Sequence, residues 1–138
     1  MTKKVFLAAD MLVAFVDRMH PQHLHAKTLM HYFASEHFAL FTTPTILDHA
    51  YTQIAQDISV SLARELLDSF AKTEVNMLFP DDKDLAHTYE LVTNSPTLEI
   101  TFTDALQATL CVRNHIPSIA TFSYIHPYLG MSAFYLPV

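Results

Sequence analysis

The sequence predicts an α/β protein with a central parallel sheet of about five strands, covered by helices on both faces. Short apolar runs rich in β-branched and aromatic residues alternate with longer stretches whose apolar residues recur with a helical period. Strands separated by helices form parallel sheets with helices on each face. No Ser- or Pro-rich linker divides the chain, so residues 1–138 are predicted to form a single domain.

The first half of the chain predicts two strands and four helices. Pro21 ends the first helix, because proline cannot continue the backbone hydrogen bonding. Pro44 instead suits the first turn of the third helix. The predicted strands are 5–9 and 38–42, and the predicted helices are 11–18, 22–36, 45–56 and 59–72.

The second half predicts three further strands and two helices. Residues 75–79 form a compact apolar run and are predicted to be the third strand. Asp81, Asp82 and Asp84 cluster where a helix start favours acids, so a helix is predicted from there to about Thr93. The other predicted elements are a helix over 104–114, a strand over 118–121 and an edge strand over 133–136.

Composition excludes several functional classes. The formal net charge is −6 and the eight Lys and Arg residues are scattered, so no basic stripe favours tight, unaided nucleic-acid binding. A single glycine, Gly130, excludes the Gly-rich phosphate loops of nucleotide-binding proteins. A single cysteine, Cys111, excludes an internal disulfide and fits a reducing compartment. The N-terminal apolar run is too short for a secretory core or a membrane span, so a cytoplasmic location without membrane association is expected.

Several polar side chains stand near the ends of the predicted strands. Asp10 follows the first strand, Asp48 and His49 follow the second, and Ser123 follows the fourth, while Asp104 opens the last long helix. In open parallel sheets, binding sites lie beyond the carboxyl ends of the strands. These side chains can therefore converge at one edge of the sheet.

Four segments of the chain together resemble the PIN-domain family, in particular its VapC-type toxin ribonucleases. They are VFLAADMLVAFVDRMHPQH, TTPTILDHAYTQ, FTDALQATLCVRNHIPSIATFSYIHPYLG and FYLP, and residues 102–130 are the most specific part. The resemblance implies a PIN-like three-layer sandwich and a site in which four acids hold Mg²⁺ or Mn²⁺ for RNA cleavage. It also implies an antitoxin-like protein partner, contact with RNA, and a homodimer.

The four acid positions of this family are only partly matched. They fall on Ala8, His49, Asp104 and Ser123, so Asp104 is the one retained acid and the candidate catalytic residue. Mg²⁺ prefers hard oxygen ligands, whereas alanine offers no oxygen and serine no charge. Loss of ligand charge weakens both the activation of water and the stabilisation of the leaving oxygen. Metal-dependent cleavage is therefore predicted to be impaired or lost, which favours a binding or regulatory role.

A rearranged metal site is the alternative hypothesis. Asp10 shares a face with Ala8 if the first strand continues through both residues, and it could then reach a displaced ion. Asp48 lies about 100° from the second acid position around the helix, whereas His49 occupies that position. A cluster of Asp10, His49 and Asp104 would favour Mn²⁺, Zn²⁺ or Fe²⁺ over Mg²⁺, because imidazole prefers transition metals. The chain would then be an active endoribonuclease.

Each candidate also has a purely structural interpretation. Asp104 can stabilise a helix N-terminus that a neighbouring threonine caps. Asp10 can cap the helix that follows it. His49 and Ser123 can be hydrogen-bonded remnants of a lost site. The histidine-rich stretch MHPQHLH can bind metal, but a polar turn is the preferred interpretation because no acid lies beside it.

Overall fold

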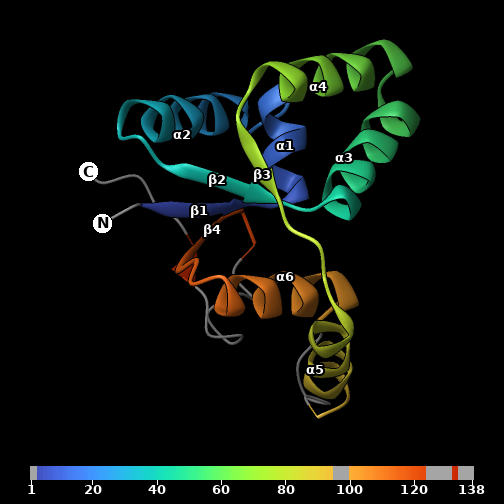
Figure 1. The fold of residues 1–138 in the computed structure, drawn as a ribbon. Coiled ribbons are helices and arrows are strands. Elements are labelled where there is room, and N and C mark those ends of the chain that lie inside the picture. The colour runs from blue at the N-terminus through green and yellow to red at the C-terminus, as the bar shows by residue number, and fades with distance from the viewer. Residues whose placement is uncertain (1–2, 95–99, 124–131, 134–138) are drawn as a thin grey trace.

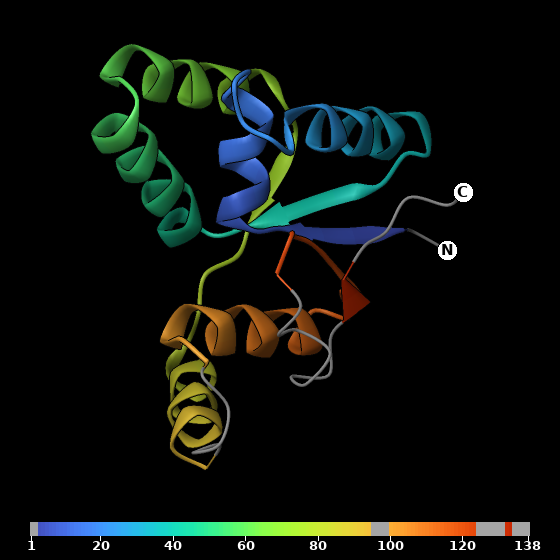
Figure 2. The same cartoon turned by 180° about the vertical axis from the view of Figure 1, so that it is seen from behind.

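A parallel sheet separates two unequal helical layers, as Figure 1 shows. The computed structural model describes residues 3–94, 100–123 and 132–133. Helices α1 to α4 cover one face of the sheet, and α6, against which α5 packs, covers the other; Figure 2 shows the same layers from behind. The elements are β1 (Lys4–Leu7), α1 (Ala9–Val16), α2 (His23–Ser35), β2 (Ala39–Thr42), α3 (Pro44–Asp57), α4 (Val60–Lys72), β3 (Val75–Met77), α5 (Asp82–Thr93), α6 (Phe102–Arg113), β4 (Ser118–Ala120) and β5 (Ser132–Ala133).

The strand order is β3-β2-β1-β4-β5, and all neighbouring strands are parallel. The chain therefore begins at the centre of the sheet, builds outward through β2 and β3, and then crosses to the opposite side of β1. This reversal places a topological switch point between β1 and β4. A crevice beyond the carboxyl ends of strands at such a point is the usual place for a binding site in an open α/β sheet.

The predicted α/β sandwich is confirmed, and the fifth strand of its sheet is short. Four strands contain three or four residues, and the fifth is only a two-residue pairing of 132–133 beside β4. The predicted edge strand 133–136 falls mostly outside the described residues. The first strand also ends earlier than predicted, because Ala8 is already the N-cap of α1.

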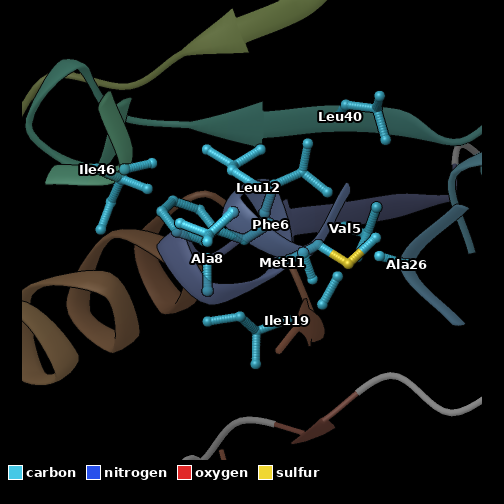
Figure 3. Packing of buried hydrophobic residues seen from close by; sticks show 14 of the residues in the cluster. Val5, Phe6, Ala8, Met11, Leu12, Ala26, Leu40, Ile46 and Ile119 are labelled. Carbon is cyan, nitrogen blue, oxygen red and sulfur yellow. The ribbon is translucent and has the colours of Figure 1, made fainter. Parts of the chain in front are cut away.

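The central position of β1 explains why its sequence is uniformly apolar. Val5, Phe6 and Leu7 are fully buried, as expected for a parallel strand covered on both faces. They belong to a core that also includes residues of α1, α2, α3, α4 and α6. Ala8 and Ile46 belong to the same cluster (Figure 3), so the apolar core reaches the start of α1.

Side-chain caps define the N-termini of four helices, namely α3, α4, α5 and α6. Thr43 caps α3 by accepting a hydrogen bond from Ile46 N, and Pro44 occupies the first turn. Asp81 and Asp84 form a reciprocal capping box at α5, and the Asp84 N–H is the main reason why the pKa of Asp81 is lowered. Asp84 is also buried and pairs with Arg113 Nε at 2.7 Å, which ties α5 to α6.

Two helices end on histidines with left-handed backbone conformations. His37 (φ 56°) follows α2 and His115 (φ 57°) follows α6. In each case the next residue donates a backbone hydrogen bond into the last turn: Phe38 to Phe33, and Ile116 to Cys111. This is the Schellman arrangement, which usually places glycine at the left-handed position.

Glycine at these two positions should stabilise the protein. His37→Gly and His115→Gly should each raise the free energy of unfolding by about 0.5–1 kcal/mol, because glycine adopts positive φ without a Cβ clash. Urea denaturation measures the change. His87→Gly is the matched control, since His87 is an exposed residue within α5, where glycine should lower the stability by about 1 kcal/mol. A decrease at His37 and His115 similar to that of the control would contradict the Schellman interpretation.

Cys111 is buried in the core, and burial raises the pKa of its thiol to about 12, so it is a neutral packing residue at physiological pH.

Within the described part of the chain, every helix is too short or too polar to cross a bilayer.

Candidate functional site

One cavity of about 520 Å³ lies beyond the carboxyl ends of β1 and β4, at the switch point of the sheet. Its walls come from the start of α1, the first turns of α3, the N-terminal half of α6 and the segment after β4. Five of the six site residues considered from the sequence line it: Ala8, Asp10, His49, Asp104 and Ser123. The four positions of the family acids therefore meet around one space.

Ala8 contributes only a methyl group to this cavity. It is the N-cap residue of α1, with extended backbone angles (φ −82°, ψ 164°) and no side-chain cap. Its backbone N–H donates to Ala120 O at 3.2 Å, which joins the end of β1 to the end of β4. The side chain is 5% exposed and has no atom that could ligate a metal.

Asp10 connects α1 to the chain that leaves β4. Its carboxylate accepts hydrogen bonds from the N–H groups of Met11 and Phe122 and from the hydroxyl of Thr121, each at 2.8 Å. Both carboxylate oxygens are therefore engaged. The prediction that Asp10 caps the helix was wrong, because α1 begins one residue earlier and Asp10 lies in its first turn. The proposed extension of the strand to this residue was also wrong.

Asp104 stabilises the beginning of α6. Its backbone N–H donates to Thr101 Oγ1 at 3.0 Å, and its carboxylate oxygen Oδ2 accepts from the Thr101 N–H at 3.3 Å. This reciprocal pair is a capping box, so the capping interpretation of Asp104 is confirmed. The second oxygen, Oδ1, has no hydrogen-bond partner among the described residues. Asp104 thus combines a structural role with one carboxylate oxygen that remains open to a ligand.

Of the two candidates on α3, only His49 lines the switch-point cavity. His49 is exposed and lines the main cavity, and it also borders an adjoining polar groove of about 390 Å³. Asp48 lines only that groove. The single-residue step around the helix thus separates the carboxylate of Asp48 from the switch-point cavity.

Ser123 is held near the cavity through its backbone. Its N–H donates to Thr121 Oγ1 at 3.1 Å, and the same hydroxyl donates to Asp10. Thr121 therefore joins Asp10 to Ser123, the fourth acid position, in one hydrogen-bonded unit, to which Ser123 contributes no charge.

Gln107 is a cavity residue that the sequence reasoning missed. It lines the same wall as Asp104 and is 5% exposed, yet its carbonyl oxygen Oε1 has no hydrogen-bond partner among the described residues. A buried acceptor without a donor typically costs about 1–3 kcal/mol. One feature of the sequence could have indicated this burial. Gln107 is a polar residue among the apolar residues Ala105, Ala108 and Leu110 of α6, all of which are buried.

The histidine-rich segment has structural contacts, in agreement with the preferred interpretation of a polar turn. His20 Nδ1 accepts from Gln22 N at 3.0 Å, and His23 Nδ1 lies 2.9 Å from Ala14 O. The ring of His25 packs against Phe122, with ring centroids 5.6 Å apart. These contacts attach the start of α2 to α1 and to the cavity segment.

The residues around the cavity do not fit the Mg²⁺ or Mn²⁺ site that the family resemblance implies. Mg²⁺ needs near-octahedral oxygen ligation, usually with one or two carboxylates. Here Ala8 offers no ligand and both oxygens of Asp10 are engaged in hydrogen bonds. In the described part of the chain, no three His, Cys, Asp or Glu side chains are grouped closely enough to hold an ion. The Asp10, His49 and Asp104 side chains line one cavity without forming such a group.

Comparisons with known proteins agree with the fold. No protein-family model matches the sequence, and none of the curated protein sequences compared with it is significantly similar. Among solved structures, VapC20 of Mycobacterium tuberculosis, a sarcin-ricin loop cleaving toxin, superposes with a TM-score of 0.81 at 18% identity, over 92% of this chain and 95% of that chain. VapBC2 of Rickettsia felis, in a structure bound to a DNA fragment from its promoter, gives a TM-score of 0.71 at 13% identity, over 95% of this chain and 97% of that chain. The chain therefore has the PIN-like fold of VapC-type toxin structures, as the sequence predicted.

Proposed function

We propose that this chain is a VapC-like PIN domain that has lost metal-dependent nuclease activity and acts as a binding or regulatory module. The fold supports the first part, since it matches VapC-type structures over nearly the full length of both chains. The chemistry of the cavity supports the second part.

The engagement of Asp10 is the observation that carries the proposal. Three hydrogen bonds use most of the roughly four acceptor sites of its carboxylate, and Oδ2 is committed to the connection between α1 and the end of β4. Ala8 occupies the first acid position and offers no carboxylate. Among the described residues that line the cavity, Asp104 Oδ1 is the carboxylate oxygen that accepts no hydrogen bond. One such oxygen is a weak basis for holding a divalent ion during phosphodiester cleavage.

The charge of the cavity also disfavours RNA cleavage. Its lining includes Asp10 and Asp104 but no Lys or Arg among the described residues. The whole chain carries a formal net charge of −6. Because phosphate binding depends mainly on basic side chains or metal ions, an unmetallated cavity of this kind should repel an RNA backbone.

Partners are part of the same proposal. We infer an antitoxin-like protein partner and a homodimer, and a cytoplasmic location, from the resemblance to VapC-type toxins. The structure of VapBC2 from Rickettsia felis bound to promoter DNA supports a role within such a complex rather than as an isolated enzyme.

An RNA cleavage assay tests the loss of activity. Total RNA, transfer RNA and ribosomes, which contain the sarcin-ricin loop, should remain intact when incubated with the protein and Mg²⁺ or Mn²⁺. Asp104→Asn should behave identically, and VapC20 serves as the active control. Metal-dependent cleavage that disappears in Asp104→Asn would overturn the proposal and establish the alternative, an endoribonuclease with a rearranged site.

A further inference from the structure

The strand β3 leaves one backbone edge of the sheet unpaired. It is the outer strand beside β2 (Figure 1), and on its other side it has no partner strand among the described residues. The Leu78 N–H donates to Thr42 O of β2 at 2.9 Å. Because backbone groups alternate in direction along a strand, the N–H and C=O groups of Val75 and Met77 point away from β2. These groups form a free edge for hydrogen bonding.

The free edge is short, and nothing in its sequence blocks it. Thr73 N–H donates to Phe70 O, and Phe79 O accepts from Arg113 Nη2 at 3.4 Å, so this chain itself holds both ends of segment 73–79. The segment contains no proline and no lysine, which are the residues that commonly prevent pairing at an edge strand. An open edge of this kind is a template for another strand.

The charges on either side of the edge favour antiparallel pairing with a second copy of the chain. Lys72 precedes β3, whereas Asp81 and Asp82 follow it, and all three residues are exposed. Two antiparallel β3 strands bring the basic end of one copy beside the acidic end of the other. A parallel arrangement would instead bring like charges together, which is unfavourable at an interface.

We propose that two copies of this chain pair through β3 in an antiparallel register centred on Asn76. In this register, Val75 of each copy forms a hydrogen-bonded pair with Met77 of the other, so the free groups of both strands are used. Phe79, which is 67% exposed, comes to lie opposite Thr73 of the other copy, and such aromatic and β-branched pairs stabilise strand pairing. The two-fold arrangement is closed and joins the two sheets into one. The inference rests on the homodimer of the proposed function and specifies its surface.

A single cysteine at the centre of the strand tests the register. Asn76 is exposed and faces Asn76 of the second copy in a non-hydrogen-bonded pair, the pair type with the shorter Cβ separation. Asn76→Cys should therefore form a disulfide-linked dimer under mild oxidation at least roughly tenfold faster than Glu74→Cys. Glu74 is the matched control because it is also exposed but faces Leu78 of the second copy. The native Cys111 is buried and does not compete.

Like charges at the same position test the pairing in solution. Sedimentation equilibrium of the unmodified protein should show a reversible equilibrium between monomer and dimer. Asn76→Lys should weaken this association at least about tenfold, because two lysines then stand directly opposite each other. Asn94→Lys, the same change at an exposed position that ends α5, should leave the association unchanged. Mixing Asn76→Lys with Asn76→Asp should restore association as a heterodimer, which a loss of folding would prevent.

Three results would overturn the inference. A protein that stays monomeric at every concentration would also remove the homodimer from the proposed function. A dimer that persists in Asn76→Lys, or an Asn76→Cys variant that cross-links no faster than Glu74→Cys, would place the interface elsewhere and leave the homodimer standing. The loss of nuclease activity is tested separately, because RNA cleavage does not depend on which surface joins the two copies.

Discussion

Introducing three acids around the cavity should create a Mn²⁺ site. The triple variant Ala8→Asp, His49→Glu and Ser123→Asp, with Asp104 retained, should bind Mn²⁺ at least about a hundredfold more tightly than the unmodified protein, or about 2.8 kcal/mol. The reason is that these four positions already line one cavity and lack only ligand charge. Titration followed by electron paramagnetic resonance measures the free ion directly.

The triple variant should also fold, because its substitutions suit their backbone positions. Ala8 is an N-cap residue with extended backbone angles, which aspartate favours. His49 and Ser123 are exposed. A charge-matched control places three acids at exposed positions of α2 and α4, namely Ser35→Asp, Ser61→Asp and Ala71→Asp. If the folded triple variant binds Mn²⁺ no better than this control, or if adding Asp104→Asn leaves its affinity unchanged, the four positions do not form a latent metal site.

Removing the carboxylate of Asp10 should destabilise the protein strongly. Asp10→Ala should lower the free energy of unfolding by about 2–4 kcal/mol, because two backbone N–H groups and one hydroxyl lose a charged acceptor together. Asp48→Ala is the matched control, since Asp48 is an exposed acid with no hydrogen bond among the described residues, and its effect should stay within about 0.5 kcal/mol. Guanidinium denaturation with EDTA present measures both.

The Asp10 result distinguishes a structural carboxylate from a metal ligand. A structural role predicts the same loss with and without Mn²⁺, and a smaller loss for Thr121→Val, which removes one of the three donors. An Asp10→Ala variant as stable as Asp48→Ala in EDTA, but unable to bind Mn²⁺ that the unmodified protein binds, would show that Asp10 is a ligand.

The architecture could be predicted from sequence because its determinants are local. An uninterrupted apolar run marked the buried central strand β1, and Pro44 and the acids at 81–84 marked helix starts, all of which agree with the structure. Asp104 could be predicted as a helix-stabilising residue for the same reason. Its partner Thr101 is only three residues away, so the capping box is visible in the sequence.

The cavity contacts could not be predicted because they join distant segments. Asp10 is separated by more than a hundred residues from Thr121 and Phe122, and nothing local announces this pairing. Gln107 is a polar residue of a helix, and its apolar neighbours alone do not distinguish it from an exposed one, although it is buried. The ends of α2 and α6 agree with the prediction within one residue. The left-handed conformations of His37 and His115 could not be predicted, because histidine stands where glycine would have indicated them.

Binding of Mn²⁺ by the unmodified protein tests the central claim most directly. Titration of the purified chain with Mn²⁺, followed by electron paramagnetic resonance, should reveal only weak binding that is the same in Asp104→Asn. Tight binding of one or two ions that Asp104→Asn abolishes would contradict the claim that this cavity no longer supports a metal-dependent nuclease.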